Sequence, residues 1–382
     1  MDKILYFANV RIPTEKAHGY QVMKMCENFS SLGLQIELVL PTRLNKNFER
    51  VSPFEFYNLS ENFRIKKIKS FDPVFLFGAP SGFYIKVQSV LFMISLFFFL
   101  LLKRNNPESI FYTRDEHLLP LLQMFSGRVV WEGHNLPKNK DFYLPLWQNC
   151  YKIITISKGL KNRLVNLGLS EDKILISPDG VDMNEFLSIT DDKNELRKKL
   201  NLPIDKKIIF YTGHLYDWKG AQVLADSAKM LGRECLVVFV GGTDKDISEF
   251  KNRNQSENIL IVGRKLHEEI PYYLKAADVL VLPNSAKKDI SNFYTSPIKL
   301  FEYMAAARPI VASALPSIKE ILDQTNSILV EPDNPKALAD GITKVLSNVE
   351  LADSIAKKAF EKVGDYTWQK RAKIIDNFLK SG

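Results

Sequence analysis

Short, continuously apolar segments alternate with helical stretches along almost the whole chain, and this alternation restricts the fold more than any other feature. Strands that are buried on both faces of a sheet carry such unbroken runs of Val, Ile, Leu and Phe, and parallel sheets covered by helices require them. The predicted strands are Lys3–Val10, Gln35–Pro41, Ser109–Arg114, Val129–Glu132, Tyr151–Ser157 and Ile174–Pro178, then Lys207–Gly213, Leu236–Gly241, Asn258–Gly263, Asp278–Pro283, Pro309–Ser313 and Ser327–Glu331. These two sets predict an α/β chain with two Rossmann-like, doubly wound parallel-sheet domains.

A chain of 382 residues is longer than one hydrophobic core comfortably holds, so two domains are the default. The segment Ser177-Pro-Asp-Gly-Val-Asp182 separates the two sets of strands, and its Pro and Gly favour a turn. We therefore predict a first domain over 1–182 and a second over 183–364. The tail, 365–382, reads as an amphipathic helix that can pack on either domain.

The composition is that of an ordinary globular protein, with 46% hydrophobic and 25% charged residues, which argues against disorder. The net charge of +8 suits an anionic partner such as a nucleotide, an acidic lipid surface or nucleic acid. Nucleic acid is disfavoured because no concentrated basic stripe with aromatic residues is present. Cys26, Cys150 and Cys235 match no disulfide or metal spacing, and the N-terminus begins as a strand, so we expect a cytoplasmic protein.

The segment Val87–Leu102 is almost wholly apolar and is followed by Lys103 and Arg104. As a helix it would span about 24 Å, which is short of the roughly 30 Å hydrocarbon core of a bilayer. Its nearly all-round apolarity favours a helix buried against the first sheet. A surface helix that dips into a membrane is the alternative.

The stretch Tyr294–Ser313 combines a helix start with two chargeable side chains. We expect Ser296 to be the N-cap and Pro297 the first helical residue. Lys299 and Glu302 then lie three apart on one face, near the positive end of the helix. Such a pair can hold sugar hydroxyls and a phosphate, although a capped helix with an incidental Lys–Glu pair explains the same residues equally well.

Three other loops that follow predicted strands carry candidate residues. Gly19, in the first loop, would let the backbone approach an anion, or the loop is only a turn. His134 follows a strand and is placed to reach a ligand, or it is a hydrogen-bonded structural imidazole. Gly213 allows a close turn, and Lys219 precedes a helix from Ala221, which suits a diphosphate as well as a solvated lysine.

Several classes of chemistry find no support in the sequence. There is no dinucleotide-binding GxGxxG, no P-loop, no GxSxG and no HExxH. The Asp244-Lys-Asp246 triplet has the form of a Mg²⁺ or Mn²⁺ site. It follows Gly-Gly-Thr and has acidic residues where a helix begins, so we interpret it as the first turn of a surface helix and predict no metal site.

Taken together, these segments resemble the retaining glycosyltransferases of family 4, which have the two-domain GT-B fold. The resemblance extends over most of the chain and rests on Lys16–Gln21, Glu132–His134, Ser177–Asp182, Gly213–Gly220 and, most specifically, Ser296–Ala305. It implies two domains that face a cleft and a last helix that returns to the first domain. It further implies that a nucleotide sugar binds mainly the second domain and the acceptor mainly the first.

The resemblance also implies roles for individual residues. Glu302 would hold the ribose hydroxyls, Lys219 the diphosphate, and His134 the donor sugar near the reacting carbon. Gly19 would bring backbone amides close to the phosphates. The remaining donor-binding residues implied are Gly213, His214, Ser296, Lys299 and, beside the nucleobase, Arg264.

Two positions depart from the family pattern. Tyr294 stands where the first of two glutamates, separated by seven intervening residues, is usual, so nearby backbone or Lys299 would replace its sugar contact. His214 stands where a diphosphate-binding arginine is common, and it is neutral much of the time at pH 7. Lys219 would then compensate more of the diphosphate charge.

The function implied is metal-independent, cofactor-free transfer of a hexose or related sugar from a UDP- or GDP-linked donor, with retention of configuration. A glycan or glycolipid acceptor in cell-surface polysaccharide or glycolipid synthesis is expected. An anionic membrane surface is a further possible partner, with peripheral attachment to the inner membrane face. The alternatives are a nucleotide-sugar epimerase on the same fold, and a non-catalytic sugar-nucleotide binder, which Tyr294 and His214 suggest.

Overall fold

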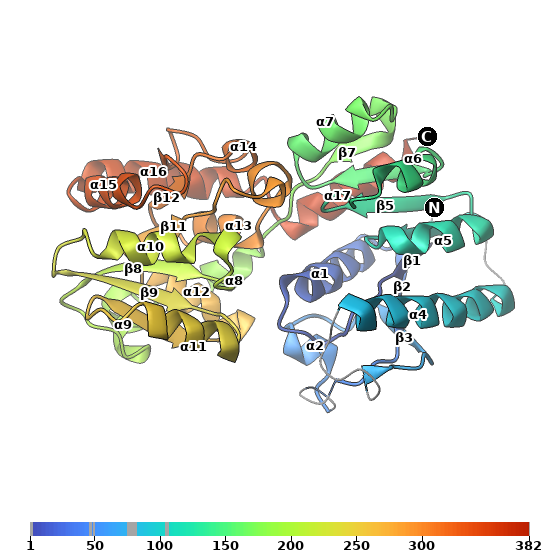
Figure 1. Ribbon diagram of the computed structural model, residues 1–382, viewed down its shortest axis with the longest axis horizontal. Coiled ribbons are helices and arrows are strands. Elements are labelled where there is room, and N and C mark those ends of the chain that lie inside the picture. The colour runs from blue at the N-terminus through green and yellow to red at the C-terminus, as the bar shows by residue number, and fades with distance from the viewer. Residues whose placement is uncertain (1–2, 46–47, 49, 75–81, 104–106, 382) are drawn as a thin grey trace. The chain divides into compact units, whose positions relative to one another are not determined.

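The computed structural model describes residues 3–45, 48, 50–74, 82–103 and 107–381. It divides into two compact units, which we call the N-terminal unit and the C-terminal unit (Figure 1). The N-terminal unit comprises Met1–Ile156, Leu160–Ser177 and Trp368–Gly382, and the C-terminal unit comprises Ser157–Gly159 and Pro178–Thr367. The last helix of the chain thus belongs to the first unit.

The chain passes from the N-terminal to the C-terminal unit after Ser177, slightly before the expected position after Asp182. The Val181 amide donates to the Tyr366 carbonyl at 2.9 Å, and Val181 forms a parallel bridge with Thr367. Because this pairing joins the turn to the end of the C-terminal unit, the residues after Ser177 belong there.

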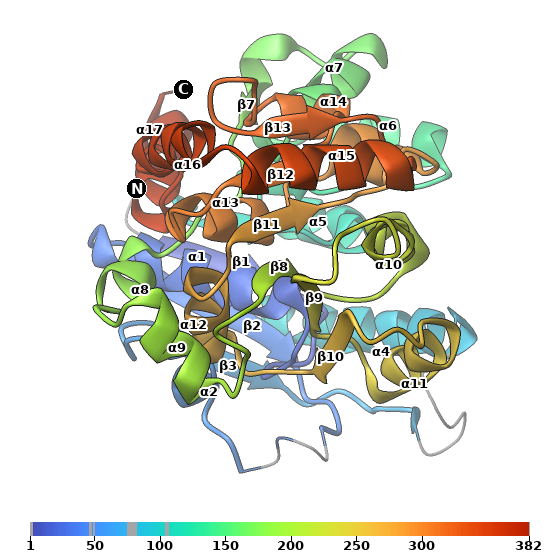
Figure 2. The same cartoon turned by 90° about the vertical axis from the view of Figure 1, so that its left-hand side faces the viewer.

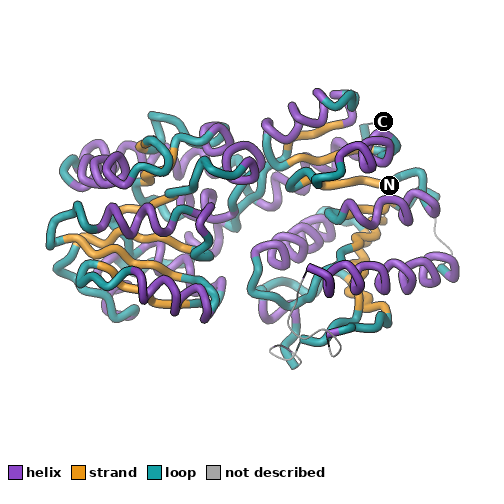
Figure 3. Tube along the Cα trace, in the orientation of Figure 1, coloured by secondary structure: helices purple, strands orange, loops and turns teal. Residues whose placement is uncertain are grey.

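The N-terminal unit is built on a seven-stranded parallel sheet with the order β3-β2-β1-β4-β5-β6-β7. Figure 3 draws strands in orange and helices in purple. Its strands are β1 (Lys3–Phe7), β2 (Gln35–Pro41), β3 (Arg64–Ile68), β4 (Ile110–Thr113), β5 (Val129–Gly133), β6 (Lys152–Thr155) and β7 (Ile174–Ile176). The strand order reverses between β1 and β4, where the loops after these strands diverge. Ligands of open α/β sheets bind at such a point, outside the carboxyl ends of the strands.

Helices cover this sheet on both faces. They are α1 (Ala17–Ser31), α2 (Pro53–Phe56), α4 (Gly82–Leu102), α5 (Leu119–Phe125), α6 (Lys140–Gln148), α7 (Lys158–Asn166) and α17 (Trp368–Lys380). Helices α1 and α17 pack together, with the Tyr20 and Trp368 ring centroids 6.2 Å apart. Helix α4 packs on β3 and α5, with the Phe97 and Phe125 ring centroids 5.7 Å apart.

Helix α4 packs against the first sheet as expected, but it buries only one of its faces. Its buried stripe of Tyr84, Gln88, Phe92, Leu96 and Leu100 repeats every four residues, and each of these is at most 2% exposed. A second stripe with the same spacing is exposed: Val90, Ile94, Phe98 and Leu102, at 50%, 51%, 56% and 84%. By length and composition alone, Phe83–Leu102 also suffices to cross a membrane.

The C-terminal unit has a six-stranded parallel sheet with the order β10-β9-β8-β11-β12-β13, and Figure 2 shows these strands following one another across the sheet. The strands are β8 (Lys207–Thr212), β9 (Cys235–Val240), β10 (Ile259–Gly263), β11 (Val279–Leu282), β12 (Ile310–Ser313) and β13 (Ile328–Val330). The strand order reverses between β8 and β11. The loops that follow these two strands therefore border the ligand-binding position of this fold.

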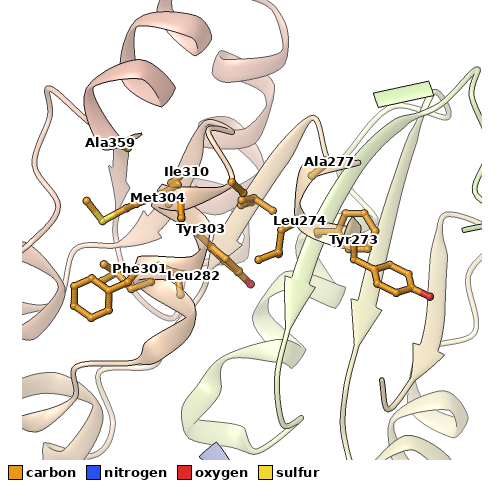
Figure 4. Close-up of a cluster of buried hydrophobic side chains, with 14 of the residues drawn as sticks. Tyr273, Leu274, Ala277, Leu282, Phe301, Tyr303, Met304, Ile310 and Ala359 are labelled. Carbon is orange, nitrogen blue, oxygen red and sulfur yellow. The ribbon is translucent and has the colours of Figure 1, made fainter. Parts of the chain in front are cut away.

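The helices of the C-terminal unit bury apolar residues on both faces of its sheet. They are α8 (Met183–Leu187), α9 (Lys193–Lys199), α10 (Ala221–Ala228), α11 (Asp244–Arg253), α12 (Ile270–Lys275), α13 (Ile298–Ala305), α14 (Pro316–Lys319), α15 (Pro335–Leu346) and α16 (Val349–Val363). In one of the two cores, Phe301 and Met304 of α13 pack with Leu282 of β11 and Ile310 of β12 (Figure 4). This packing fixes α13 beside the carboxyl ends of the central strands.

Candidate functional site

In the C-terminal unit, the loops after β8 and β11 touch backbone to backbone. Gly213 and Gly220 have φ of 120° and 74°, values that L side chains rarely adopt. A Cβ at Gly220 would lie 1.7 Å from the Pro283 carbonyl oxygen, so only glycine fits there. Gly220 is also the residue before α10, and this contact brings the start of that helix to the end of β11.

Lys219 lies in the turn before α10 and is partly buried. Its Nζ lies 4.4 Å from the Trp218 ring centroid, and no carboxylate pairs with it in the described part of the chain. Burial lowers the pKa of Lys219 to about 8. The ammonium group is therefore held by an aromatic face and lacks an anionic partner.

Lys299, in the first turn of α13, is buried, at 8% exposed. Its Nζ lies 4.1 Å from the Tyr211 ring centroid and has no hydrogen-bond partner among the described residues. Burial and then the nearby Lys219 ammonium hold the pKa of Lys299 well below its usual range, against a smaller opposite effect of Glu302. Two lysines near enough to lower each other's pKa are an arrangement that an anion between them would stabilise.

Asn284 adds further unsatisfied polar atoms to this edge of the sheet. It follows β11, is fully buried, and neither atom of its side-chain amide has a hydrogen-bond partner among the described residues. Its backbone nitrogen would lie 3.3 Å from a Cβ at Gly220, so it borders the loop that carries Lys219. Buried amides are nearly always paired, and such an orphan points to a ligand or ordered water.

Glu302 lies one turn beyond Lys299 but faces a different neighbour. His267 Nε2 is 3.7 Å from Glu302 Oε1 and 3.5 Å from Glu185 Oε2, so the imidazole lies between two carboxylates. The pKa of Glu302 is raised, because burial outweighs the lowering effect of His267 and the nearby Glu185 carboxylate raises it further. No Lys299–Glu302 ion pair is found in the described structure, so the simple interpretation as a helix-surface salt bridge does not hold.

The sequence did not identify Glu185 and His267 as site residues. They come from α8 and from the turn before α12, and only the folded sheet brings them to α13. His267 lies just beyond Arg264, the residue proposed to approach a nucleobase, which is exposed. The closeness of His267 to the Arg264 loop in sequence was the signal that could have identified it.

The capping role expected for Ser296 is wrong. The helix begins at Ile298 with Pro297 in the N-cap position, and the Ser296 hydroxyl accepts a hydrogen bond from the Asp179 amide at 3.1 Å. Ser296 thus ties the turn at the unit boundary to the start of α13. Tyr294 is buried, at 8% exposed, in the preceding π-helical turn.

The other predicted residues of this unit are placed as follows. The His214 ring stacks on Tyr216, with centroids 4.8 Å apart and planes 1° from parallel. Asp244 and Asp246 lie in the first turn of α11, and Asp246 forms a capping box with Thr243, with both hydrogen bonds at 3.2 Å. The interpretation of this triplet as a helix start is confirmed.

In the N-terminal unit, His134 is held by a fully buried carboxylate at the end of β5. Glu132 Oε1 lies 2.6 Å from His134 Nε2, and it also accepts from Gln21 at 2.8 Å and from Arg371 of α17 at 3.0 Å. The Tyr112 hydroxyl donates to the other carboxylate oxygen. Burial acts to raise the pKa of Glu132, but Arg371 and His134 hold it well below its usual range.

Gly19 lies in the first turn of α1, and its amide donates to the Lys16 carbonyl at 3.0 Å. A Cβ there would lie 2.4 Å from both the Tyr57 hydroxyl and the Thr14 methyl group, so packing explains the glycine. The adjacent His18 has its pKa lowered to about 4 by burial and then by Arg114. His18 is therefore neutral at pH 7.

Comparisons with known proteins show what this chain is similar to. The family model described as "Glycosyl transferases group 1" matches residues 192–362, within the C-terminal unit. An uncharacterized glycosyltransferase of Methanocaldococcus jannaschii is 29% identical over 62% of this chain and 62% of its own length. The amylovoran biosynthesis glycosyltransferase AmsK of Erwinia amylovora is 25% identical over 56% of this chain and 52% of its own. The matches thus span roughly half to three fifths of these relatives.

The crystal structure of Anabaena HepE with UDP and glucose superposes with a TM-score of 0.76 over 100% of both chains, at 14% identity. At that identity the similarity establishes the fold alone. The chain has the GT-B fold, and the family-model match and the relatives support the family resemblance found in the sequence.

Proposed function

We propose that this protein transfers a sugar from a nucleotide-diphosphate sugar to an acceptor. The observation that supports this most is the pair Lys219, which is partly buried, and Lys299, which is buried. Neither amino group has an anionic partner in the described chain. Burying such groups is costly unless an anion joins them. A diphosphate beside two lysines and the N-terminus of α10 would supply that anion, and HepE, which shares the fold, has been crystallised with UDP.

The two lysines also suit the chemistry of the transfer. Breaking the bond between sugar and phosphate builds negative charge on the leaving diphosphate, and preorganised cations stabilise that charge most where water is excluded. The diphosphate would raise the lowered pKa of both amines, so each would be charged when the donor is bound. We propose that this replaces a metal ion, and that UDP or GDP is the leaving group.

The remaining roles follow the family resemblance. Glu302 would accept the ribose hydroxyls, with His267 beside it, and Lys299 would make the contact that Tyr294 cannot. His134, fixed by Glu132, would contact the transferred sugar. We propose retention of configuration by attack on the same face, with the leaving phosphate accepting the acceptor's proton.

We further propose that the N-terminal unit binds the acceptor, a glycan or glycolipid of a cell-surface polysaccharide. The name of AmsK, an amylovoran biosynthesis enzyme, supports polysaccharide synthesis. The exposed stripe Val90, Ile94, Phe98 and Leu102 supports a cytoplasmic protein attached to a membrane surface through α4. Loss of flotation with anionic liposomes in Ile94→Glu/Phe98→Glu would support this; wild-type protein recovered only in the soluble fraction would refute it.

The test of the donor site is nucleotide release from a panel of UDP and GDP sugars, with and without acceptor glycans. Lys219→Ala is expected to lower turnover by roughly 100- to 1,000-fold while the protein stays folded. Lys229→Ala, an exposed lysine at the far end of α10, is the matched control and should keep full activity. Near-normal turnover of Lys219→Ala would refute the proposal.

The same assay separates the two alternatives. An epimerase would convert the donor sugar without an acceptor and without releasing nucleotide. A non-catalytic binder would show a thermal shift with the nucleotide sugar and no turnover with any acceptor.

A further inference from the structure

A small, strongly cationic cavity lies in the N-terminal unit, apart from Glu132 and His134. It has a volume of about 160 Å³, and its walls include Arg11, Arg43 and Lys67. Its other described lining residues are apolar, except for the amide of Asn45, and none is acidic. Since a water molecule takes about 30 Å³ of liquid volume, the cavity has room for an oxyanion.

The cavity lies at the carboxyl edge of the sheet. Arg11 is in the loop after β1, Arg43 follows β2, and Lys67 is near the end of β3, opposite Leu40 of β2. This is the edge at which open α/β sheets bind ligands. His134, which follows β5, lies at the same edge.

The two guanidinium groups converge on one neutral side chain. Arg11 and Arg43 both donate to the Tyr84 hydroxyl, at 3.0 and 3.1 Å, and that hydroxyl donates to Asp72 at 2.6 Å. The carboxylate of Asp72 is thus separated from both arginines by a hydroxyl. It is also engaged by the amides of Leu44 and Val74.

Both arginines keep donors that the described protein does not use. The Nε atoms of Arg11 and Arg43 are buried and have no hydrogen-bond partner among the described residues, and neither arginine has an ion pair there. A larger cavity of about 940 Å³ at the opposite edge of the sheet is different, because its Lys3 lies 3.8 Å from Glu37. Unlike the larger cavity, the Arg11–Arg43–Lys67 cavity has no acidic residue among its described lining residues.

We propose that the Arg11–Arg43–Lys67 cavity binds a phosphate group of the acceptor. Arginine forks match the geometry of phosphate oxygens, and the third cation at the rim compensates a second negative charge. This inference rests on the proposed function, because it takes the N-terminal unit as the acceptor-binding unit. The phosphate would belong to a water-soluble sugar phosphate or to a lipid phosphate.

The test titrates the full-length protein with inorganic phosphate by calorimetry and compares single variants. Arg43→Gln is expected to weaken binding at this cavity by roughly tenfold or more, and Lys67→Gln by roughly two- to fivefold. Lys66→Gln, on the neighbouring residue of the same strand and outside the cavity, is the matched control. Lys67 is exposed, so its variant cannot fail through misfolding of the core.

Lys219→Ala keeps this test independent of the donor site, which also binds phosphates. If the Arg11–Arg43–Lys67 cavity binds phosphate, Lys219→Ala retains the phosphate binding that Arg43→Gln loses. Arg43-dependent competition of glucose 1-phosphate with inorganic phosphate would identify a soluble sugar phosphate. Arg43-dependent flotation with phosphatidic acid vesicles, and not with phosphatidylcholine vesicles, would identify a lipid phosphate. Phosphate affinity unchanged in both Arg43→Gln and Lys67→Gln would overturn the proposal, whatever Lys219→Ala does.

Discussion

The buried charges of the two units are arranged in opposite ways. In the N-terminal unit, Glu132 accepts hydrogen bonds from Gln21, His134, Tyr112 and Arg371, so its charge is fully compensated within the protein. In the C-terminal unit, the amino groups of Lys219 and Lys299 face aromatic rings and form no ion pair with any described residue. A satisfied charge of this kind holds structure together, whereas an unsatisfied one indicates a missing ligand.

The largest effect expected from this contrast is on folding. Glu132→Gln keeps the shape of the side chain but leaves the Arg371 guanidinium buried without its anion, which should cost about 3–5 kcal/mol of stability. Because unfolding of a two-unit chain is not two-state, hydrogen exchange of peptides from β5 and α17 is the appropriate measurement. Exchange as slow as in the wild type would show that Glu132 is not the centre of a structural network.

Replacing a lysine of the C-terminal unit should lower turnover and leave stability intact. Lys299→Met removes a buried amine that has no hydrogen-bond partner among the described residues, so stability should be unchanged or increased. Turnover should fall by roughly 100-fold, because one positive charge beside the leaving diphosphate is lost. Lys287→Met, a lysine on the loop after β11, serves as the control for turnover. Loss of stability in Lys299→Met together with normal turnover would reverse our assignment.

Acid should affect the N-terminal unit through His18. Its pKa falls from the usual 6.5 to about 4 on folding, so the unfolded chain binds the proton more tightly. The stability is intact above pH 6.5 and is lost as the pH falls towards 4, by about 3 kcal/mol. Hydrogen exchange in α1 at pH 7 and pH 4, with each rate divided by the intrinsic rate at that pH, measures this loss as an increase in local opening. In His18→Gln the increase in opening on acidification should be smaller than in the wild type, and an equal increase in both proteins would contradict the prediction.

Alkali should affect the donor site through Lys219. Its amine has a pKa of about 8, so the charged form that binds a diphosphate is lost as the pH rises through 8. The value of kcat/KM for the donor, which reports the free enzyme, should fall about tenfold per pH unit above this point. Lys219→Arg, which stays charged, should abolish this fall, and a pH profile shared by both proteins would assign the titration to another group.

Much of the fold could be predicted because buried parallel strands have a distinctive pattern. All twelve predicted strands are present, with ends that differ by a few residues. Strand β3 was missed because Arg64-Ile-Lys-Lys-Ile68 is a mostly exposed edge strand without an apolar run. The exposed stripe of α4 was missed because a helix that is apolar on every side has no periodicity to show which face is buried.

The candidate site was less predictable, because it depends on side-chain partners. The sequence identified Lys219, Lys299 and Glu302 as candidates, but it could not show that Lys299 faces Tyr211 while Glu302 faces His267. Local rules also gave the wrong partner for Ser296, whose hydroxyl binds the distant Asp179 amide. Contacts between residues far apart in sequence decided each of these cases.

The most direct test of our central claim is calorimetric titration with UDP and GDP at pH 8, in two buffers that differ in ionisation enthalpy. If the lysine pair holds the diphosphate, the wild type should take up protons as the nucleotide binds, because the anion raises the lowered pKa of Lys219 and Lys299. Proton uptake should decrease in Lys219→Arg and in Lys299→Met. Tight binding without proton uptake, at an affinity that neither substitution changes, would contradict the account.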